Sequence, residues 1–385
     1  MSVSAPPTPQ SIAPRKTGRL REFWQRVSEG RDVEDLWHQF AADAQSSYGF
    51  YGKDVDWEQI DKLPVWKRPF PVIKQFFWAL MSKLSPARRV LLLIAIALIV
   101  FSVVSGPSNG KSGSEFNYEF LAAAVLLLLL SLELADKIIM KRDLEIAREI
   151  QSWLVPADPP PIHGADVAFS TRPQNSVAGD YYDAFYPNKD ADSGGKLMLV
   201  MADVAGKSVP AALLMATLQA SLHTIASEGF ALAELAKRLN HYASAHSLDG
   251  RRFTTAVIAE YEPGTRRLSY VNAGHNAPIL RRANGGIERL ESGSVPFGIT
   301  DEVSFDAAEV YLQPGDTLIL FTDGVVEAFN SANEEFSDPR WVKLVRTLPA
   351  MPAKMTLEFL MKQVDDFVGA TRQSDDITCL VLRCN

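Results

Sequence analysis

Residues 197–207 read LMLVMADVAGK, a run of six apolar residues that ends at Asp203. A short apolar run bounded by polar residues and glycine is typical of a buried β-strand. Similar runs recur toward the C-terminus, and turns of a few residues, such as residues 262–265, separate the middle ones. Such turns are too short for a crossover between parallel strands, so antiparallel neighbours are expected. The predicted strands are residues 197–202, 255–261, 267–272, 278–281, 317–321 and 378–382.

Helical periodicity fills the gaps between these strands. Apolar residues recur at helical spacing in residues 210–227, 232–245 and 356–368, and Pro210 suits a first helical turn. The sequence therefore predicts an α/β (α+β) domain in which mainly antiparallel sheets are flanked by helices.

Five acidic residues stand at or near the ends of predicted strands. A single aspartate beside a turn has an ordinary structural explanation. Several at one sheet edge would bring like charges together, which is tolerated only with a cation between them. Carboxylate oxygens favour hard cations such as Mg²⁺ or Mn²⁺. The residues concerned are Asp180, Asp203, Asp323, Asp375 and Asp376.

Residues 205–208, AGKS, present a competing pattern, because they resemble the end of a phosphate-binding GxxxxGKS loop. The first glycine of such a loop would fall at position 201, where the chain has Met201. Nucleotide binding is therefore disfavoured, and Lys207 is expected to be a solvated loop residue. His275, in a turn that reads AGHN, is expected to be structural or close to substrate rather than a proton donor.

Length and composition bound the class of protein. The chain has 385 residues, 47% of them hydrophobic, which suits two or three domains. Its 39 basic and 46 acidic residues give a net charge of −7, which argues against nucleic acid as a partner. Its two cysteines, Cys379 and Cys384, lack CxxC spacing, so neither a disulfide scaffold nor a four-ligand zinc site is expected.

The N-terminal third is organised differently. Residues 1–18 are expected to be a disordered tail, because they are rich in Pro, Ser, Ala and Thr. Residues 19–87 carry five of the seven tryptophans and are predicted to be a cytosolic helical region. Within it, residues 70–84 have an apolar face that suits either a buried helix or a helix lying on a membrane surface.

Two charge-free runs, residues 90–104 and 120–132, predict a transmembrane hairpin. Each is shorter than the ~20 residues that span a bilayer, but extension to residues 88–106 and 116–136 brings both near that length. The alternative is a buried helical hairpin in a soluble core. Lysines and arginines flank the hairpin, and the loop at 107–115 has Lys111 alone. Both ends are therefore expected in the cytoplasm, which predicts a multi-pass inner-membrane protein.

Residues 137–157 are predicted to form a linker helix that ends at the prolines from Pro156 onward. Two adjoining apolar stripes on it suit a parallel dimeric coil, although the stretch is short enough to suit a helix docked on the next domain equally. A homodimer through this helix is the interpretation we adopt. Residues 158–385 are assigned to the C-terminal domain.

Eight motifs occur in an order that resembles the SpoIIE/RsbU-like branch of the metal-dependent PPM-type serine/threonine phosphatases. The resemblance runs from about Leu144 to Cys384 and leaves out the hairpin and everything before it. The motifs are AREIQ at residues 147–151, AGDYYD at 178–183, DVAGK at 203–207, AGHN at 273–276, PFG at 296–298, PGD at 314–316, TDGVVEA at 322–328 and DDIT at 375–378.

This resemblance implies a PPM-type β-sandwich flanked by helices, with two Mn²⁺ or Mg²⁺ ions at one end. It also implies metal-dependent hydrolysis of phosphoserine or phosphothreonine on a partner protein, of the anti-sigma-factor antagonist type, by a metal-activated water. The alternatives are a catalytically silent membrane-anchored scaffold that binds a phosphoprotein and, behind it, a nucleotide-binding protein. The implied catalytic residues are Asp180, Asp203, Asp323 and Asp375, and the implied metal ligands are these four with the Val204 carbonyl and Asp376, which spacing does not separate from Asp375.

Overall fold

The computed structural model describes residues 69–105, 117–187, 195–206, 208–247, 252–291 and 293–385. The chain divides into two compact units, Met1–Asp136 and Lys137–Asn385. The predictions for residues 1–18, for the loop at 107–115, for Lys207 and for all but the end of the helical region lie outside the described residues.

Two five-stranded sheets form the second unit, and every strand pair in them is antiparallel. The first sheet has the order β1-β10-β9-β6-β7 and the second has the order β2-β3-β4-β5-β8. The strands of the first sheet are β1 (Ala165–Arg172), β10 (Ile377–Cys384), β9 (Thr317–Phe321), β6 (Ile279–Arg281) and β7 (Ile287–Arg289). Those of the second are β2 (Asp180–Phe185), β3 (Leu197–Val204), β4 (Thr254–Glu262), β5 (Arg267–Ala273) and β8 (Ala308–Tyr311).

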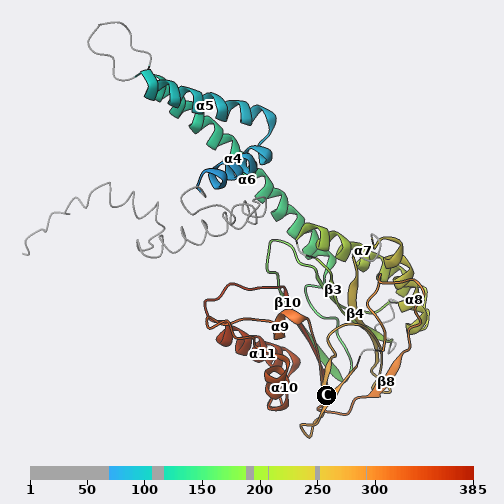
Figure 1. Ribbon diagram of the computed structural model, residues 1–385. Helices are drawn as coiled ribbons and strands as arrows, with labels where there is room; N and C mark the ends of the chain where they lie inside the picture. The colour runs from blue at the N-terminus through green and yellow to red at the C-terminus, as the bar shows by residue number, and fades with distance from the viewer. Residues whose placement is uncertain (1–68, 106–116, 188–194, 207, 248–251, 292) are drawn as a thin grey trace, which may run out of the picture. The chain divides into compact units, whose positions relative to one another are not determined.

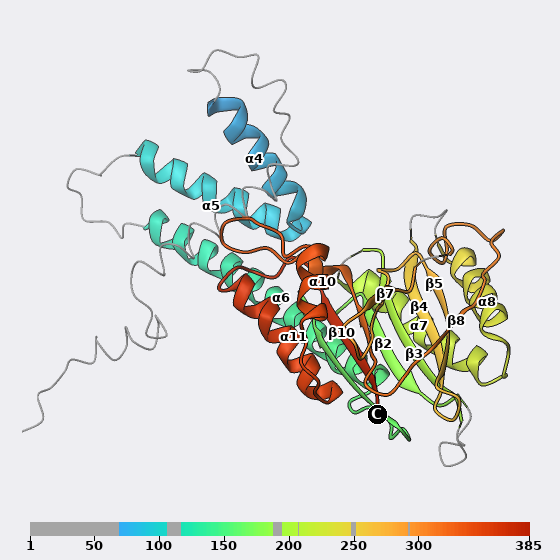
Figure 2. The same cartoon turned by 90° about the horizontal axis from the view of Figure 1, so that it is seen from below.

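Helices cover the outer face of each sheet, which makes a four-layer α-β-β-α sandwich (Figures 1 and 2). Helices α7 (Val209–Ala226) and α8 (Leu232–Ala245) pack on the second sheet. Helices α10 (Asp338–Arg346) and α11 (Ala353–Val368) pack on the first, and a short helix, α9 (Asp323–Val326), follows β9.

Apolar side chains fill the three spaces between these layers. Alternate residues of β3 point to opposite faces of the sheet, as the strand repeat requires. Leu197, Leu199 and Met201 lie in the core between the sheets, whereas Met198 and Val200 lie in the core under α7 and α8. A third core, around Trp341, joins the first sheet to α10 and α11. The continuous apolar run therefore reflects a strand that is buried on both faces.

The predicted fold class is confirmed, and all six predicted strands are present, most of them longer by one to three residues. The predicted helices correspond to α7, α8 and α11. Strands β1, β2, β7 and β8 and helices α9 and α10 were not predicted. In β2, two aspartates interrupt the apolar pattern of the sequence DYYDAF, although the first five residues are buried. A search for apolar runs does not find a strand whose buried residues include aspartates.

Three helices, α4 (Pro69–Lys83), α5 (Pro86–Ser105) and α6 (Tyr118–Leu154), precede the sandwich in the chain. The predicted helical linker is the C-terminal part of α6, which ends shortly before Pro156. Helices α5 and α6 are long and apolar enough to cross a membrane, and many of their large apolar side chains are exposed, for example Val104 at 78% and Phe120 at 77%. Helix α7 also meets this length and hydropathy criterion, but its apolar face is buried against the second sheet.

Candidate metal centre

The first part of the candidate site is a pair of aspartates on neighbouring strands. Asp180 begins β2 and lies directly opposite Asp203 in the β2–β3 ladder. The Asp180 side chain is buried, and two hydroxyls from the other sheet donate to its Oδ2 atom, Thr322 at 2.9 Å and Thr378 at 2.5 Å. Asp180 therefore joins the two sheets at one end of the sandwich.

Burial raises the pKa of the Asp180 carboxyl well above its ordinary value, and the nearby charges of Asp203 and Asp376 add to this rise. The hydroxyl hydrogen bonds from Thr322 and Thr378 act in the opposite direction. A buried carboxylate with like charges beside it is unfavourable by itself. Either a proton or a bound cation relieves the repulsion.

The second part of the site joins the ends of β9 and β10. Asp323 begins α9 two residues after the end of β9, and Asp375 stands two residues before β10. Gly324 brings these segments together, because its Cα packs against the backbone of residues 375 and 376. A β-carbon at position 324 would overlap the Asp376 carbonyl oxygen. Only glycine permits this approach.

Asp376 has a different environment from Asp375. Its Oδ1 accepts the backbone N–H of Gln174 and its Oδ2 accepts that of Gly179, both at 2.7 Å. Both carboxylate oxygens thus hold the loop that leads into β2. The backbone N–H of Asp376 in turn donates to the Asp375 carboxylate at 2.9 Å.

Gly179 allows the close approach of this loop to the end of β3. A β-carbon on it would lie 3.2 Å from the Val204 carbonyl oxygen and 3.6 Å from the nearer carboxylate oxygen of Asp203. The Val204 carbonyl and the Asp203 carboxylate therefore face the same small space. A larger residue at position 179 would occupy part of it.

The donor set consists of carboxylate and carbonyl oxygens, which fits Mg²⁺ or Mn²⁺. Within the described ranges, the structure contains no ready-made group of three or more His, Cys, Asp or Glu side chains that could hold a metal ion. Instead, Asp180 and Asp203 lie on one sheet, and Asp323 and Asp375 lie at strand ends of the other. The hydrogen bonds of Thr322, Thr378 and Asp376 connect the two parts.

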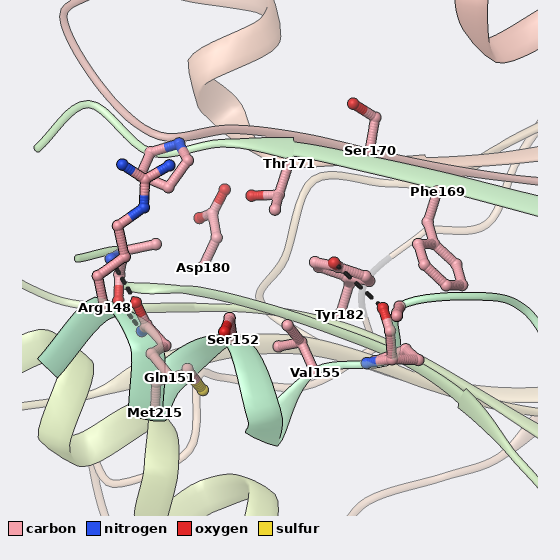
Figure 3. A pocket seen from close by; sticks show the side chains of 14 residues that line it. Arg148, Gln151, Ser152, Val155, Phe169, Ser170, Thr171, Asp180, Tyr182 and Met215 are labelled. Carbon is pink, nitrogen blue, oxygen red and sulfur yellow. Dashed lines mark hydrogen bonds between the residues drawn. The ribbon is translucent and has the colours of Figure 1, made fainter. Parts of the chain in front are cut away.

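A cavity of about 530 Å³ opens beside Asp180, between β1, β2, α7 and the end of α6 (Figure 3). On the α6 side of the cavity, the side-chain amide of Gln151 makes two hydrogen bonds with the backbone of Ala178. Its Nε2 donates to the Ala178 carbonyl at 2.8 Å, and its Oε1 accepts the Ala178 N–H at 2.9 Å. The last turns of α6 are thereby attached two residues before Asp180.

His275 is buried. Its Nδ1 lies 2.8 Å from the Thr255 hydroxyl, and Thr255 faces Asp203 across the β3–β4 ladder. Burial lowers the pKa of His275 to about 4, so the ring is neutral at pH 7. Met201, where the first glycine of a nucleotide-binding loop would stand, is fully buried inside β3, which disfavours such a loop at this position.

Sequence reasoning missed the residues that organise the acids. Thr322, Thr378, Gln174 and Gln151 act through hydrogen bonds to partners between 27 and 202 residues away along the chain. Thr322, Thr378 and Gln151 lie within motifs quoted from the sequence, and this position is the signal that could have found them.

A sandwich of two antiparallel sheets with helices on both outer faces is the fold of the PPM-type serine/threonine phosphatases, and aspartates stand at or near strand ends of both sheets. The chain belongs to the SpoIIE family of these enzymes, since the sequence model of that family, Stage II sporulation protein E, matches residues 193–385.

Two relatives from Bacillus subtilis agree with this assignment. Phosphoserine phosphatase RsbU is 26% identical over 248 residues, which are 63% of this chain and 70% of RsbU. Phosphoserine phosphatase RsbP is 25% identical over 253 residues, which are 64% of this chain and 58% of RsbP.

Solved structures show the same fold. The SiaA-PP2C domain of Pseudomonas aeruginosa has a TM-score of 0.56 and 20% identity, and the match covers 65% of this chain and 99% of that domain. The PP2C domain of SpoIIE from Bacillus subtilis, solved with a fragment of its regulatory domain, has a TM-score of 0.50 and 18% identity, with coverage of 58% and 64%.

Proposed function

We propose that this phosphatase hydrolyses phosphoserine or phosphothreonine on a small partner protein, with two Mn²⁺ or Mg²⁺ ions in its site. The observation that carries the proposal is the pairing of the buried Asp180 with the half-buried Asp203 on neighbouring strands, tied by Thr322 and Thr378 to the strand ends that bear Asp323 and Asp375. This arrangement supports a cation site at the end of the sandwich.

In this proposal, Asp180, Asp203, Asp323 and Asp375 hold the ions, together with the Val204 carbonyl. Such ions, when bound, supply an activated water and neutralise the phosphate oxygens. Thr322 and Thr378 orient Asp180, and Asp376 holds the loop at residues 174–179. We assign Asp375 rather than Asp376 as the ligand, because both oxygens of Asp376 already accept backbone N–H groups.

The class of partner is a further part of the proposal. The names of RsbU and RsbP both specify phosphoserine phosphatase activity. The family resemblance favours a phosphorylated anti-sigma-factor antagonist, so this chain would act in a partner-switching pathway.

Hydrolysis of a phosphoserine peptide by the full chain, with and without Mn²⁺, tests the function. We expect hydrolysis that requires Mn²⁺ and that Asp203→Asn reduces at least 100-fold. Asp306→Asn, at an exposed position, is the matched control and should keep full activity. A wild-type chain that binds the phosphoprotein but never hydrolyses it would instead be a silent scaffold.

The hairpin of α5 and α6 is proposed to anchor the enzyme in the inner membrane, with the catalytic domain in the cytoplasm. Within this unit Arg88 pairs with Glu133 at 2.9 Å and Asp136 at 2.6 Å, and Ser102 donates to Glu119 at 2.9 Å. The acidic residues near the two ends of the predicted span at residues 116–136 thus have polar partners. A cysteine introduced at Ser112 should react with an impermeant thiol reagent added outside intact cells, since both native cysteines are buried.

The linker part of α6 is proposed to mediate a homodimer. Its apolar stripe includes Ile146, Ile150 and Trp153, whose exposed fractions are 46%, 50% and 73% within the single chain. Disulfide crosslinking of Leu144→Cys or Ile150→Cys tests this contact in the active enzyme. Absence of any crosslinked dimer would count against it.

A further inference from the structure

The cavity beside Asp180 has a polar rim and a buried floor. Arg148 and Ser152, from the last turns of α6, are exposed and line its edge. Asp180, Tyr182 and Met215 are buried and line its interior. Figure 3 shows Arg148 and Asp180 directed into the same space from α6 and β2 respectively.

Arg148 is available to bind an anion. Its guanidinium forms no ion pair or hydrogen bond with any other residue in the described part of the chain, Asp180 included. By contrast, Arg172 pairs with Asp365, and Arg282 pairs with both Glu288 and Asp316. A guanidinium offers five N–H donors in a planar fork that matches phosphate oxygens.

The hydrogen bonds of Gln151, one helical turn from Arg148, set the position of Arg148 relative to Asp180. Residues three apart lie on the same face of a helix, so Arg148 and Gln151 face the domain together. The two hydrogen bonds between Gln151 and Ala178 fix this face two residues from Asp180. Arg148 thus lines the same cavity as Asp180 although it lies outside both sheets.

We propose that this cavity receives the phosphorylated side chain of the substrate and that Arg148 binds its phosphate oxygens. This inference rests on the proposed function, because it places the phosphate between the guanidinium and the cations held at Asp180. A phosphate dianion is repelled by uncompensated carboxylates, so it needs positive charge on its open side as well. Phe169 and Tyr182, whose ring centroids are 4.9 Å apart, offer an apolar wall to the residues beside the phosphorylated one.

The test compares Arg148→Ala, Arg148→Lys and Arg142→Ala in the full-length chain. Arg142 lies on the same helix, is exposed and does not line the cavity, so its variant is the matched control. Two quantities are measured with Mn²⁺ present: KM and kcat for a phosphoserine peptide, and the affinity for inorganic phosphate by calorimetric titration. Thermal unfolding checks that each variant is folded.

We expect Arg148→Ala to raise KM and to weaken phosphate binding at least tenfold, with Arg148→Lys intermediate and Arg142→Ala unchanged. Unchanged KM and phosphate affinity in a folded Arg148→Ala enzyme would overturn the inference. A higher KM for the peptide with unchanged phosphate affinity would also overturn it, because Arg148 would then contact another group of the partner. A wild-type chain without hydrolysis would refute the proposed function, and the phosphate titration would still decide the role of Arg148.

Discussion

The Cα of Gly324 packs against the backbone carbonyl of Asp376 so closely that no side chain fits between them. This contact holds the start of α9, with Asp323, beside the segment that carries Asp375. The two acids come from motifs about 50 residues apart in the chain, and the glycine is the reason that they meet.

Substitution of this glycine should therefore damage both stability and the site. Gly324→Ala forces the segment at residues 375–376 to move, and we expect a loss of about 1–3 kcal/mol in the free energy of unfolding. Metal-dependent hydrolysis should fall with it. Thermal unfolding measures the effect, with Gly264→Ala as control, because a β-carbon there meets nothing within 4 Å. Equal stability of the two variants would contradict the contact.

Asp375 and Asp376 should be separable by mutation. Asp376→Ala leaves the N–H groups of Gln174 and Gly179 without their acceptor, and each such loss costs about 1–3 kcal/mol. Asp375→Asn should leave the metal-free chain nearly as stable as wild type but should weaken Mn²⁺ binding at least tenfold. Chemical denaturation and a Mn²⁺ titration measure the two effects. The reverse pattern would exchange the roles of the two residues.

Metal should stabilise the wild-type domain through Asp180. At 100 times its dissociation constant, Mn²⁺ adds about 2.7 kcal/mol to the free energy of unfolding. Asp180→Asn should abolish this gain. It should also raise the unfolding temperature of the metal-free chain, because it removes a buried carboxylate that Asp203 and Asp376 repel. A metal-free variant less stable than wild type would show that the repulsion is unimportant.

Because His275 is buried and neutral, we expect the free energy of unfolding to fall on acidification. The ordinary pKa of histidine is 6.5, and burial lowers it to about 4 in the folded chain. The unfolded chain therefore takes up the proton first as the pH falls. The contribution of the neutral His275 to the free energy of unfolding is complete above pH 6.5 and is lost between pH 6.5 and 4. Between pH 7 and pH 5 the loss amounts to about 2 kcal/mol.

Denaturation of the metal-free chain at both pH values, for wild type and His275→Gln, isolates this contribution. The pH dependence should become shallower in His275→Gln, whereas His163→Gln, at an exposed position, should behave as wild type. Identical pH dependence in wild type and His275→Gln would show that the ring is accessible to protons.

The sequence by itself predicted the elements whose local pattern is strong. The apolar run at residues 197–202 specifies a strand buried on both faces, and the helical repeat at 232–245 specifies α8 to the residue. The acids proposed as metal ligands are visible in the sequence as well, because each stands at or near a strand end within a motif. These features depend on neighbours in the chain, which is why pattern alone identifies them.

The tertiary structure decided which groups surround those acids. Thr322 and Thr378 bind Asp180 across some 140 and 200 residues, and Asp376 is distinguished from Asp375 by its burial and by the loop that it holds. Arg148 stands in the AREIQ motif, but its place beside the cavity depends on the contact between Gln151 and Ala178. Hydrogen bonds and close packing between distant segments depend on the folded geometry, and no local pattern encodes them.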